Sequence, residues 1–311
     1  MAKVSIIGAG MTGATTAHWL AEHELADIVL VDVIEGMQQG KALDLLEAMP
    51  IVGKDVGIVG SNDYEVTKDS DIIVITAGLA RKPGMSRDDL LTANAAIVGK
   101  ATTETLKYSP NAIYVVLTNP LDTMAYLTLK VGNLPPHRVI GQAGILDSAR
   151  MRAFVALETG VSVENINCYV LGGHGDEMVP LTNHSNIAGI PLREYLPADK
   201  LEGIINRTRK GGGEIVNLLK TGSAFYAPAA AITQMVDAIL KDKHLIVPCA
   251  AYMQGEYGLK DMFFGVPVQL GRKGIERIIE YQLDPGEKAA FEKSAESVKE
   301  TIHALNNLVK L

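Results

Sequence analysis

Cysteine is scarce in this chain of 311 residues, which contains only Cys168 and Cys249. Neither lies in a paired spacing such as C-x-x-C, so the sequence offers no zinc-ligand pattern of that kind. No window approaches the roughly 18 apolar residues that a membrane span needs, and the first residues lack a basic segment followed by a long apolar stretch. We therefore expect a protein of the reducing cytoplasm that does not associate with membranes.

Basic residues are outnumbered as well. The chain has 29 Lys and Arg against 36 Asp and Glu, a formal net charge of −7 and a pI near 5.5. This balance argues against a nucleic-acid partner, because a nucleic-acid surface needs a dominant basic field. Any bound anion must therefore meet local positive charge, and one concentration stands out: Arg81, Lys82 and Arg87 in "TAGLARKPGMSRDD" (76–89).

The first half of the chain alternates short apolar runs with stretches of helical periodicity. The runs are nearly continuous in apolar residues, as in strands buried on both faces of a sheet. This alternation predicts an α/β fold with a Rossmann-type, doubly wound parallel sheet, and six strands suit two mononucleotide-binding halves. The expected strands are "KVSIIG" (3–8), "DIVLVD" (27–32), "DVGIVG" (55–60), "DIIVIT" (71–76), "AIYVVL" (112–117) and "RVIG" (138–141).

The pattern changes after residue 142, so we expect two domains, 1–142 and 143–311, the second of mixed α+β type. A last helix is announced by Asp284 as N-cap, Pro285 in the first turn and Glu287 as the capping-box acid. Further elements are expected as a helix at 147–159, strands at 165–173, 178–181, 244–252 and 265–270, and a helical region at 198–240 that Gly211, Gly212 and Gly213 break.

"GAGMTG" places Gly8, Gly10 and Gly13 in a G-x-G-x-x-G pattern between the strand "VSII" and a helix that begins near Met11. In this context Gly8 would permit a tight turn, Gly10 would let the backbone reach a pyrophosphate, and Gly13 would allow close packing of helix on strand. Asp32 ends the second strand roughly 20 residues later, where an acid accepts hydrogen bonds from an adenosine ribose and repels a 2′-phosphate. The pattern predicts a dinucleotide site that favours NAD over NADP.

Two further segments follow strands at their carboxyl ends, where ligands of open α/β sheets bind. They are Thr76-Ala77-Gly78 after the fourth strand and Thr118-Asn119-Pro120 after the fifth. Alternatively, both segments could be ordinary turns, in which these residue types are common. We favour the interpretation as ligand-binding segments, because both lie at the carboxyl ends of strands.

"GGHGDEMVP" surrounds His174 with three glycines, which suggests an exposed turn or close approach to a ligand. Upstream, "GILDSARMR" offers Asp147 and Arg150, which lie on one face if they are helical. Taken singly, His174 is more readily interpreted as a structural histidine. Asp147 and Arg150, taken singly, could each be a helix cap or a surface residue.

Taken together, these stretches resemble the lactate/malate dehydrogenase family over essentially the whole chain, and within it the lactate-dehydrogenase-like malate dehydrogenases. The matching motifs are "GAGMTG", "TAGLARKPGMSR", "LTNPLD", "LDSAR", "GGHGDEMVP" and "GSAFYAPAAA", in family order and at family-like spacing. The resemblance implies an NAD-binding Rossmann domain over 1–142 and a substrate and catalytic domain over 143–311. It also implies a homo-oligomer, either a dimer or a tetramer.

The resemblance assigns roles to particular residues. His174 would exchange a proton with the substrate oxygen while Asp147 fixes and stabilises its ring. Arg150 would hold the substrate's C1 carboxylate through bidentate geometry, Asn119 would bridge cofactor and substrate, and Arg87 would polarise the reacting carbonyl. The implied cofactor-binding positions are Gly8, Ala9, Gly10, Met11, Thr12, Gly13, Asp32, Thr76, Ala77, Gly78, Asn94, Leu117, Thr118 and Asn119.

Arg81 is the residue on which the substrate prediction depends. By resemblance, malate enzymes carry Arg just after "AGLA" where lactate enzymes commonly carry Gln. A desolvated Arg81 would pair with the second carboxylate of oxaloacetate and stay unpaired beside the methyl group of pyruvate, which would discriminate roughly a thousandfold or more. Pro83 and Gly84 would shape a loop that closes over the ligand, and Lys82 is expected to be solvated.

Three other functions stay open at this level. The chain could be a lactate or other 2-hydroxyacid dehydrogenase, against which Arg81 argues. It could be an NAD-dependent glycosidase with a metal held by Cys168 and His174, although Cys168 lies in an apolar run typical of a core strand. It could also be a non-catalytic NAD-binding protein, although the candidate catalytic residues are all present. By resemblance, Ser223 and Ala224 should line the substrate end of the pocket.

Overall fold

The computed structural model describes residues 1–79 and 86–309, with the backbone alone for Arg87. Its central feature is a twisted sheet in which six strands run parallel, in the order β6-β5-β4-β1-β2-β3. This is the doubly wound order of two mononucleotide-binding halves, so the predicted Rossmann-type fold is confirmed. The strands are β1 (Lys3–Ile7), β2 (Asp27–Val31), β3 (Ile58–Ser61), β4 (Ile72–Ile75), β5 (Ile113–Val116) and β6 (Val139–Gly141).

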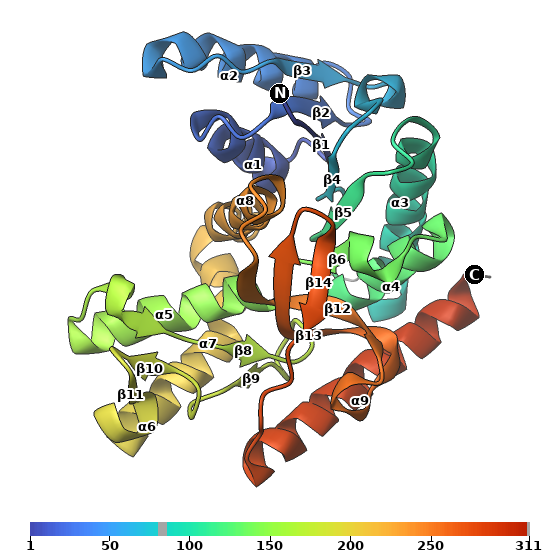
Figure 1. The fold of residues 1–311 in the computed structure, drawn as a ribbon. Coiled ribbons are helices and arrows are strands. Elements are labelled where there is room, and N and C mark those ends of the chain that lie inside the picture. The colour runs from blue at the N-terminus through green and yellow to red at the C-terminus, as the bar shows by residue number, and fades with distance from the viewer. Residues whose placement is uncertain (80–85, 310–311) are drawn as a thin grey trace.

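Helices cover both faces of this sheet. In Figure 1, α1 (Met11–Glu22) and α8 (Tyr226–Leu240) lie to one side of the strands, and α3 (Arg87–Tyr108) and α4 (Leu121–Gly132) lie to the other. All four residues of β4 are fully buried, as expected for a central strand covered on both faces. A further helix, α2 (Met37–Val52), connects β2 to the edge strand β3.

The second half of the chain extends the same sheet with antiparallel strands. β12 (Leu245–Gln254) pairs with β6 through Ala250 and Gly141, and β13 (Lys260–Gly271) and β14 (Gly274–Ile278) follow outward to give nine strands. Residue 142 directly follows β6, so we propose that the domain boundary lies there. The remaining elements are α5 (Gly144–Thr159), β7 (Ile166–Asn167), β8 (Val170–Leu171), β9 (Val179–Pro180), β10 (Asn186–Ile187), β11 (Ile190–Pro191), α6 (Leu192–Tyr195), α7 (Ala198–Leu219) and α9 (Pro285–Leu308).

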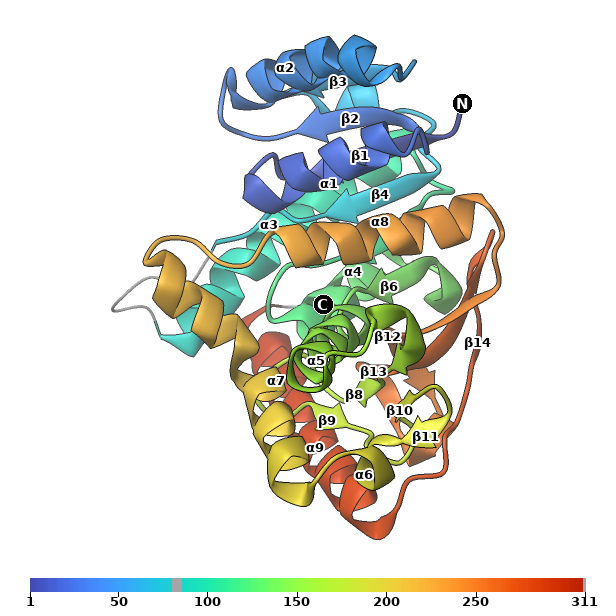
Figure 2. The ribbon, with the colours of Figure 1, turned by 90° about the vertical axis from the view of Figure 1, so that its left-hand side faces the viewer.

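A second, smaller core lies where α5 and α7 pack over the short strands, as Figure 2 shows from the side. It buries Met151 and Val155 of α5 together with Leu201 and Ile204 of α7. Cys168 belongs to the same core, and its burial raises the pKa of the thiol to about 12. The core holds α5, the helix that carries Asp147 and Arg150, against the other elements of the second half of the chain.

The glycine triplet does not break a helix, so that prediction was wrong. α7 continues through Gly211, Gly212 and Gly213 to Leu219, and the chain leaves the helix only at Lys220, where φ is 65°. The reason is packing: a Cβ at Gly211 would lie 2.3 Å from Cδ of Arg150, so glycine is the residue that lets this arginine lie against the helix. The neighbours of α7 outweigh the weak helix propensity of glycine.

Two long helices, α3 and α9, begin with side-chain caps. Asp284 accepts a hydrogen bond from the backbone N–H of Glu287 at 2.7 Å, and Glu287 accepts one from the N–H of Asp284, so the predicted capping box of α9 is confirmed. Ser86 and Asp89 form a second capping box that starts α3 at Arg87.

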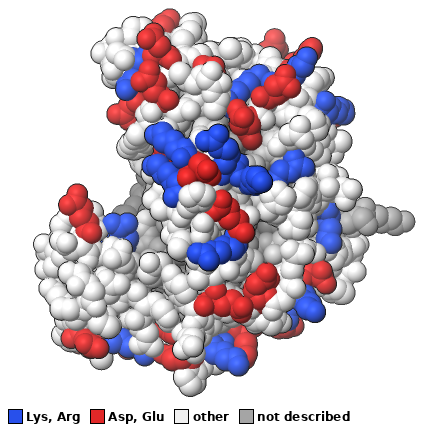
Figure 3. Space-filling model, viewed as in Figure 1, with Lys and Arg blue, Asp and Glu red and all other residues white. Residues whose placement is uncertain are grey.

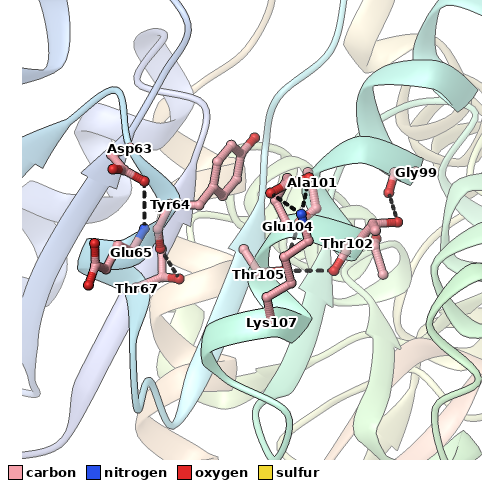
Figure 4. Close-up of polar contacts among 11 residues, drawn as sticks. Asp63, Tyr64, Glu65, Thr67, Gly99, Ala101, Thr102, Glu104, Thr105 and Lys107 are labelled. Carbon is pink, nitrogen blue, oxygen red and sulfur yellow. Dashed lines mark hydrogen bonds and ion pairs between the residues drawn. The ribbon is translucent and has the colours of Figure 1, made fainter.

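The far end of α3 is anchored away from the site. Figure 4 shows the short turn at 64–67 beside the helix, with Asp63 accepting a hydrogen bond from the N–H of Glu65 at 2.9 Å. Within α3, the hydroxyl of Thr105 donates to the carbonyl of Ala101, and Lys107 pairs with Glu104, both at 2.7 Å. The hydroxyl of Ser109, directly after α3, donates to the carbonyl of Thr67, so the turn holds the carboxyl-terminal end of the helix whose first residue is the candidate Arg87.

Within residues 1–79 and 86–309, none of the helices combines the length and the apolar character that crossing a bilayer requires.

Candidate active site

The glycine-rich turn has the geometry that each glycine was predicted to supply. Gly8 has a φ of 107°, and a Cβ there would lie 2.5 Å from the backbone nitrogen of Ala77. A Cβ at Gly13 would lie 1.8 Å from the carbonyl oxygen of Gly8, so α1 packs directly on the turn. A Cβ at Gly10 would meet no described atom within 4 Å, so the backbone is open on that side. The first N–H groups of α1 are thus accessible to an anion.

Asp32 lies beside this turn at the end of β2. Its Oδ2 accepts a hydrogen bond from the N–H of Ala9 at 2.7 Å, and its Oδ1 accepts one from the N–H of Ile34 at 3.1 Å. The carboxylate is partly exposed, and each oxygen retains capacity to accept from a hydroxyl group. From α2, the ammonium group of Lys41 donates to the carbonyl of Ala9 at 2.6 Å, a contact that no sequence motif indicated.

The segments that follow β4 and β5 are tied together by Asn94. Its buried amide accepts from the N–H of Leu79 at 2.7 Å and donates to the carbonyls of Leu79 and Asn119. Thr118 donates to the carbonyl of Ala77 at 2.7 Å across the same gap. The side-chain amide of Asn94 is engaged in these internal bonds, so its contribution to a ligand site is to hold the two segments in place.

The other predicted positions at this edge pack equally closely. The hydroxyl of Thr76 donates to the carbonyl of Gly8 at 2.9 Å, and the N–H of Leu117 donates to the carbonyl of Ile75. A Cβ at Gly78 would lie 2.4 Å from Cγ2 of Thr118. The edge predicted from the carboxyl ends of the strands is therefore one continuous, hydrogen-bonded surface.

His174 and Asp147 form a close pair in the second half of the chain. The Nδ1 atom of His174 lies 2.8 Å from Oδ2 of Asp147, and the side chains are 16% and 2% exposed. Burial alone lowers the pKa of His174, but the charge of Asp147 and its hydrogen bond outweigh burial, and the net effect raises the pKa. Because the carboxylate accepts the hydrogen on Nδ1, the Nε2 atom is left to exchange a proton with another molecule.

Arg150 reaches the same carboxylate from one turn further along α5. Its Nη1 lies 3.2 Å from Oδ1 of Asp147, and its side chain is 11% exposed. Asp147 is thus shared between an imidazole and a guanidinium, and the stem of Arg150 lies against Gly211 of α7. A planar cation and a proton-exchanging group held by one carboxylate can bind the carboxylate of a small 2-oxo or 2-hydroxy acid and exchange a proton with its neighbouring oxygen.

Several predicted residues are not placed by the structure. Arg81, Lys82, Pro83, Gly84 and Met85 lie outside the described residues. Arg87 is described only as the first residue of α3. Ser223 and Ala224 lie in the connection between α7 and α8, the first exposed and the second half-buried.

A metal held by Cys168 and His174 finds no support in the geometry. Cys168 is buried in the smaller core, and the ring of His174 is bonded to Asp147. In the described part of the chain, the grouping with metal-like spacing is Asp242, His244 and Glu276, outside the site. It lies near the tip of β14, on the face where Figure 3 shows Lys and Arg side chains crowded around a few acidic ones.

Sequence reasoning missed three residues that shape the site. Gly211 leaves the room in which the side chain of Arg150 lies against α7. The glycine triplet marked this position in the sequence, although we interpreted it as a helix break. Asp122 and Ser294 hold the backbone of the His174 turn. Asp122 lies in the quoted motif "LTNPLD", but Ser294 follows in the last helix without any local signal.

Two family models together span almost the entire sequence. The lactate/malate dehydrogenase NAD-binding domain matches residues 2–141, and the lactate/malate dehydrogenase alpha/beta C-terminal domain matches residues 145–309.

Individual proteins agree with these models. A malate dehydrogenase of Roseiflexus sp. (strain RS-1) is 57% identical over 303 residues, covering 97% of this chain and 98% of that protein. The apo structure of malate dehydrogenase from Picrophilus torridus superposes with a TM-score of 0.96 at 47% identity, covering 99% and 98% of the two chains. The lactate dehydrogenase of Cryptosporidium parvum, solved with lactic acid and β-nicotinamide adenine dinucleotide, gives a TM-score of 0.95 at 39% identity, covering 98% of each chain.

Proposed function

This chain belongs to the lactate/malate dehydrogenase family, and from that premise we propose that it interconverts (S)-malate and oxaloacetate with NAD as the redox partner. The function predicted from the motifs agrees with the curated relatives, which at 57% identity over nearly the full chain are malate dehydrogenases. The observation that carries the proposed site is the buried His174–Asp147 pair, with Arg150 on the same carboxylate.

The acid–base step follows from this geometry. The bound nicotinamide cofactor supplies hydride in the reduction of oxaloacetate and accepts it in the oxidation of malate. His174 donates the proton on Nε2 to the substrate oxygen in reduction and takes it back in oxidation. Asp147 fixes the ring through Nδ1 and stabilises the imidazolium, while Arg150 binds the C1 carboxylate and so orients the reacting carbon.

The glycine-rich turn fits a dinucleotide. The open backbone at Gly10 and the start of α1 would bind the pyrophosphate, and Asp32 would accept from the adenosine ribose hydroxyls. A 2′-phosphate beside this carboxylate would be repelled, which supports NAD over NADP. Ala9, Met11 and Thr12 complete the turn, and Asn119 would bridge cofactor and substrate.

The dicarboxylate preference is assigned to Arg81. Paired with the distal carboxylate of oxaloacetate, it would complement Arg150 at the other end of the substrate, and Arg87 would polarise the carbonyl between them. Arg81→Gln should therefore lower kcat/KM for oxaloacetate and raise it for pyruvate, changing their ratio at least about a hundredfold. Steady-state rates with both substrates measure that ratio, and an unchanged ratio would place specificity elsewhere.

We also infer a homo-oligomer, as a dimer or tetramer. Its support is the exposed apolar surface of α2, where Leu43 is 56%, Leu46 40%, Ile51 86% and Val52 51% exposed. A helix that presents several large apolar side chains to water is typical of a subunit interface. Light scattering coupled to size exclusion should give a mass of a dimer or tetramer, and a monomer would contradict the inference.

The decisive assay follows NADH consumption at 340 nm with oxaloacetate and with pyruvate side by side, and then with NADPH. We expect oxaloacetate with NADH to be the preferred pair. Faster turnover of pyruvate would make the chain a lactate dehydrogenase, and absence of turnover by folded protein that still binds NADH would reject the enzyme. Retained activity in EDTA would dispose of the metal-dependent glycosidase.

A further inference from the structure

The turn that carries His174 is anchored by two consecutive backbone N–H groups. The N–H of Gly173 donates to the hydroxyl of Ser294 on α9 at 3.0 Å, and the N–H of His174 donates to Oδ2 of Asp122 on α4 at 2.9 Å. A Cβ at Gly173 would lie only 2.5 Å from Cγ2 of Val298, so the turn sits directly on α9. One anchor is therefore a neutral hydroxyl and the other a carboxylate.

Of the two anchors, the carboxylate of Asp122 is the less favourable one to bury. Asp122 is only 5% exposed, and its Oδ1 is buried with no hydrogen-bond partner among the described residues. A buried carboxylate with an unpaired oxygen is unfavourable, and a neutral amide oxygen would accept the same N–H. Holding the backbone does not by itself explain the charge of Asp122.

We propose that Asp122 is a positioning residue for the acid–base step: it anchors the His174 turn and places a second negative charge behind the imidazolium. The proposal rests on the proposed function of His174 and adds a residue to it. Asp147 orients the ring through Nδ1, whereas Asp122 acts through the backbone nitrogen of the same residue. Together the two carboxylates favour the protonated form of His174, which is the form that donates to oxaloacetate.

In the part of the chain that the structure describes, three charged side chains interact with His174 or its immediate partner. Asp147 and Arg150 face it from α5 and Asp122 faces it from α4, while α9 contributes the neutral hydroxyl of Ser294. Burial and Asp147 have the largest effects on the pKa of His174. The charge of Asp122 raises this pKa further, and the charge of Arg150 lowers it. Burial in turn raises the pKa of Asp122 itself to about 6, and because the two groups interact, their titrations are coupled.

Asp122→Asn tests the charge, because the amide oxygen can still accept the N–H of His174. Removing the charge should lower the pKa of His174. The alkaline fall of kcat/KM for oxaloacetate at saturating NADH should then begin at lower pH, a loss of about 3- to 10-fold at pH 8 with little change near pH 5.5. Ser294→Ala is the matched control: it removes the other anchor, so it should lower the rate without moving the pH profile.

Titration of the imidazole by NMR gives a readout that does not depend on activity. His174 should show a second inflection near pH 6 as Asp122 ionises, and Asp122→Asn should remove it. A single inflection in the wild type, or a profile that Asp122→Asn leaves in place, would overturn the proposal. If the enzyme proves inactive on oxaloacetate while the coupled titration is present, the proposed function fails and the coupling of Asp122 to His174 stands.

Discussion

The two halves of the site are built from different materials. The dinucleotide half is made of backbone: three glycines, the start of α1 and a set of main-chain hydrogen bonds within and around residues 8–13. The catalytic half is made of buried side-chain charge, gathered from α4 and α5 around one histidine. The geometry of the dinucleotide half depends on positions that have no room for a side chain. The chemistry of the catalytic half depends on the protonation state of a few side chains.

The largest effect should come from the catalytic half. His174→Asn keeps the size of the side chain and removes the exchangeable proton, so turnover of oxaloacetate should fall by roughly a thousandfold or more. Because the glycine-rich turn is untouched, NADH should bind with near-normal affinity, measured by fluorescence titration. Joint loss of binding and turnover would mean that His174 supports the fold and would remove the contrast between the halves.

Two single-methyl changes test the backbone half. Gly13→Ala forces a Cβ to within 1.8 Å of the carbonyl oxygen of Gly8 and should cost about 3 kcal/mol of stability in urea unfolding. Gly10→Ala meets no described atom within 4 Å, so stability should hold while NADH binding weakens about tenfold or more. If Gly10→Ala bound NADH normally, the pyrophosphate could not lie against that residue.

In the catalytic half, Gly211 is also a position that has no room for a side chain. Gly211→Ala places a Cβ 2.3 Å from Cδ of Arg150, so this arginine must shift, and KM for oxaloacetate should rise roughly 10-fold. Gly213→Ala is the control, because its Cβ meets no described atom within 4 Å, and it should keep KM and gain about 0.5–1 kcal/mol of stability. Equal effects on KM would show that helix propensity, and not Arg150, is responsible.

The contrast also explains what the sequence could predict. The glycine turn, the six parallel strands and the capping box of α9 are local patterns, in which spacing along the chain fixes geometry. The glycine triplet led to a wrong prediction of a helix break. The side chain that requires glycine at position 211 is that of Arg150, which lies 61 residues earlier in the chain. No local rule connects residues that meet only through tertiary packing.

The contacts of His174 and its turn are non-local, whereas Asp147 and Arg150 are three residues apart on one helix. His174 meets Asp147 across 27 residues and Asp122 across 52, and Gly173 meets Ser294 across 121. The pairing of His174 with Asp147 was therefore expected by family resemblance and not from spacing. Of the two anchors of the turn, Asp122 lies in the quoted motif "LTNPLD" but Ser294 has no local signal, since a serine in the middle of an amphipathic helix is an ordinary residue.

The smallest effect concerns the stability cost of the buried charge. Burial raises the pKa of Asp122 to about 6, above its unfolded value, so the native state holds this proton more tightly and stability falls as pH rises from about 4 to about 6. The raised pKa of His174 adds stability below its unfolded pKa that is lost as pH rises, and Asp122 supports that shift.

Asp122→Asn removes the cost of the buried Asp122 charge, which the wild type carries only once Asp122 ionises above about pH 6. The stability of the variant relative to the wild type should therefore improve between pH 4.5 and pH 7.5, by about 1 kcal/mol or more. Urea unfolding at fixed protein concentration measures this difference. A difference that stays constant or shrinks with pH would mean that Asp122 is not ionised in the native state, and the catalytic half would then hold one buried carboxylate charge at His174 instead of two.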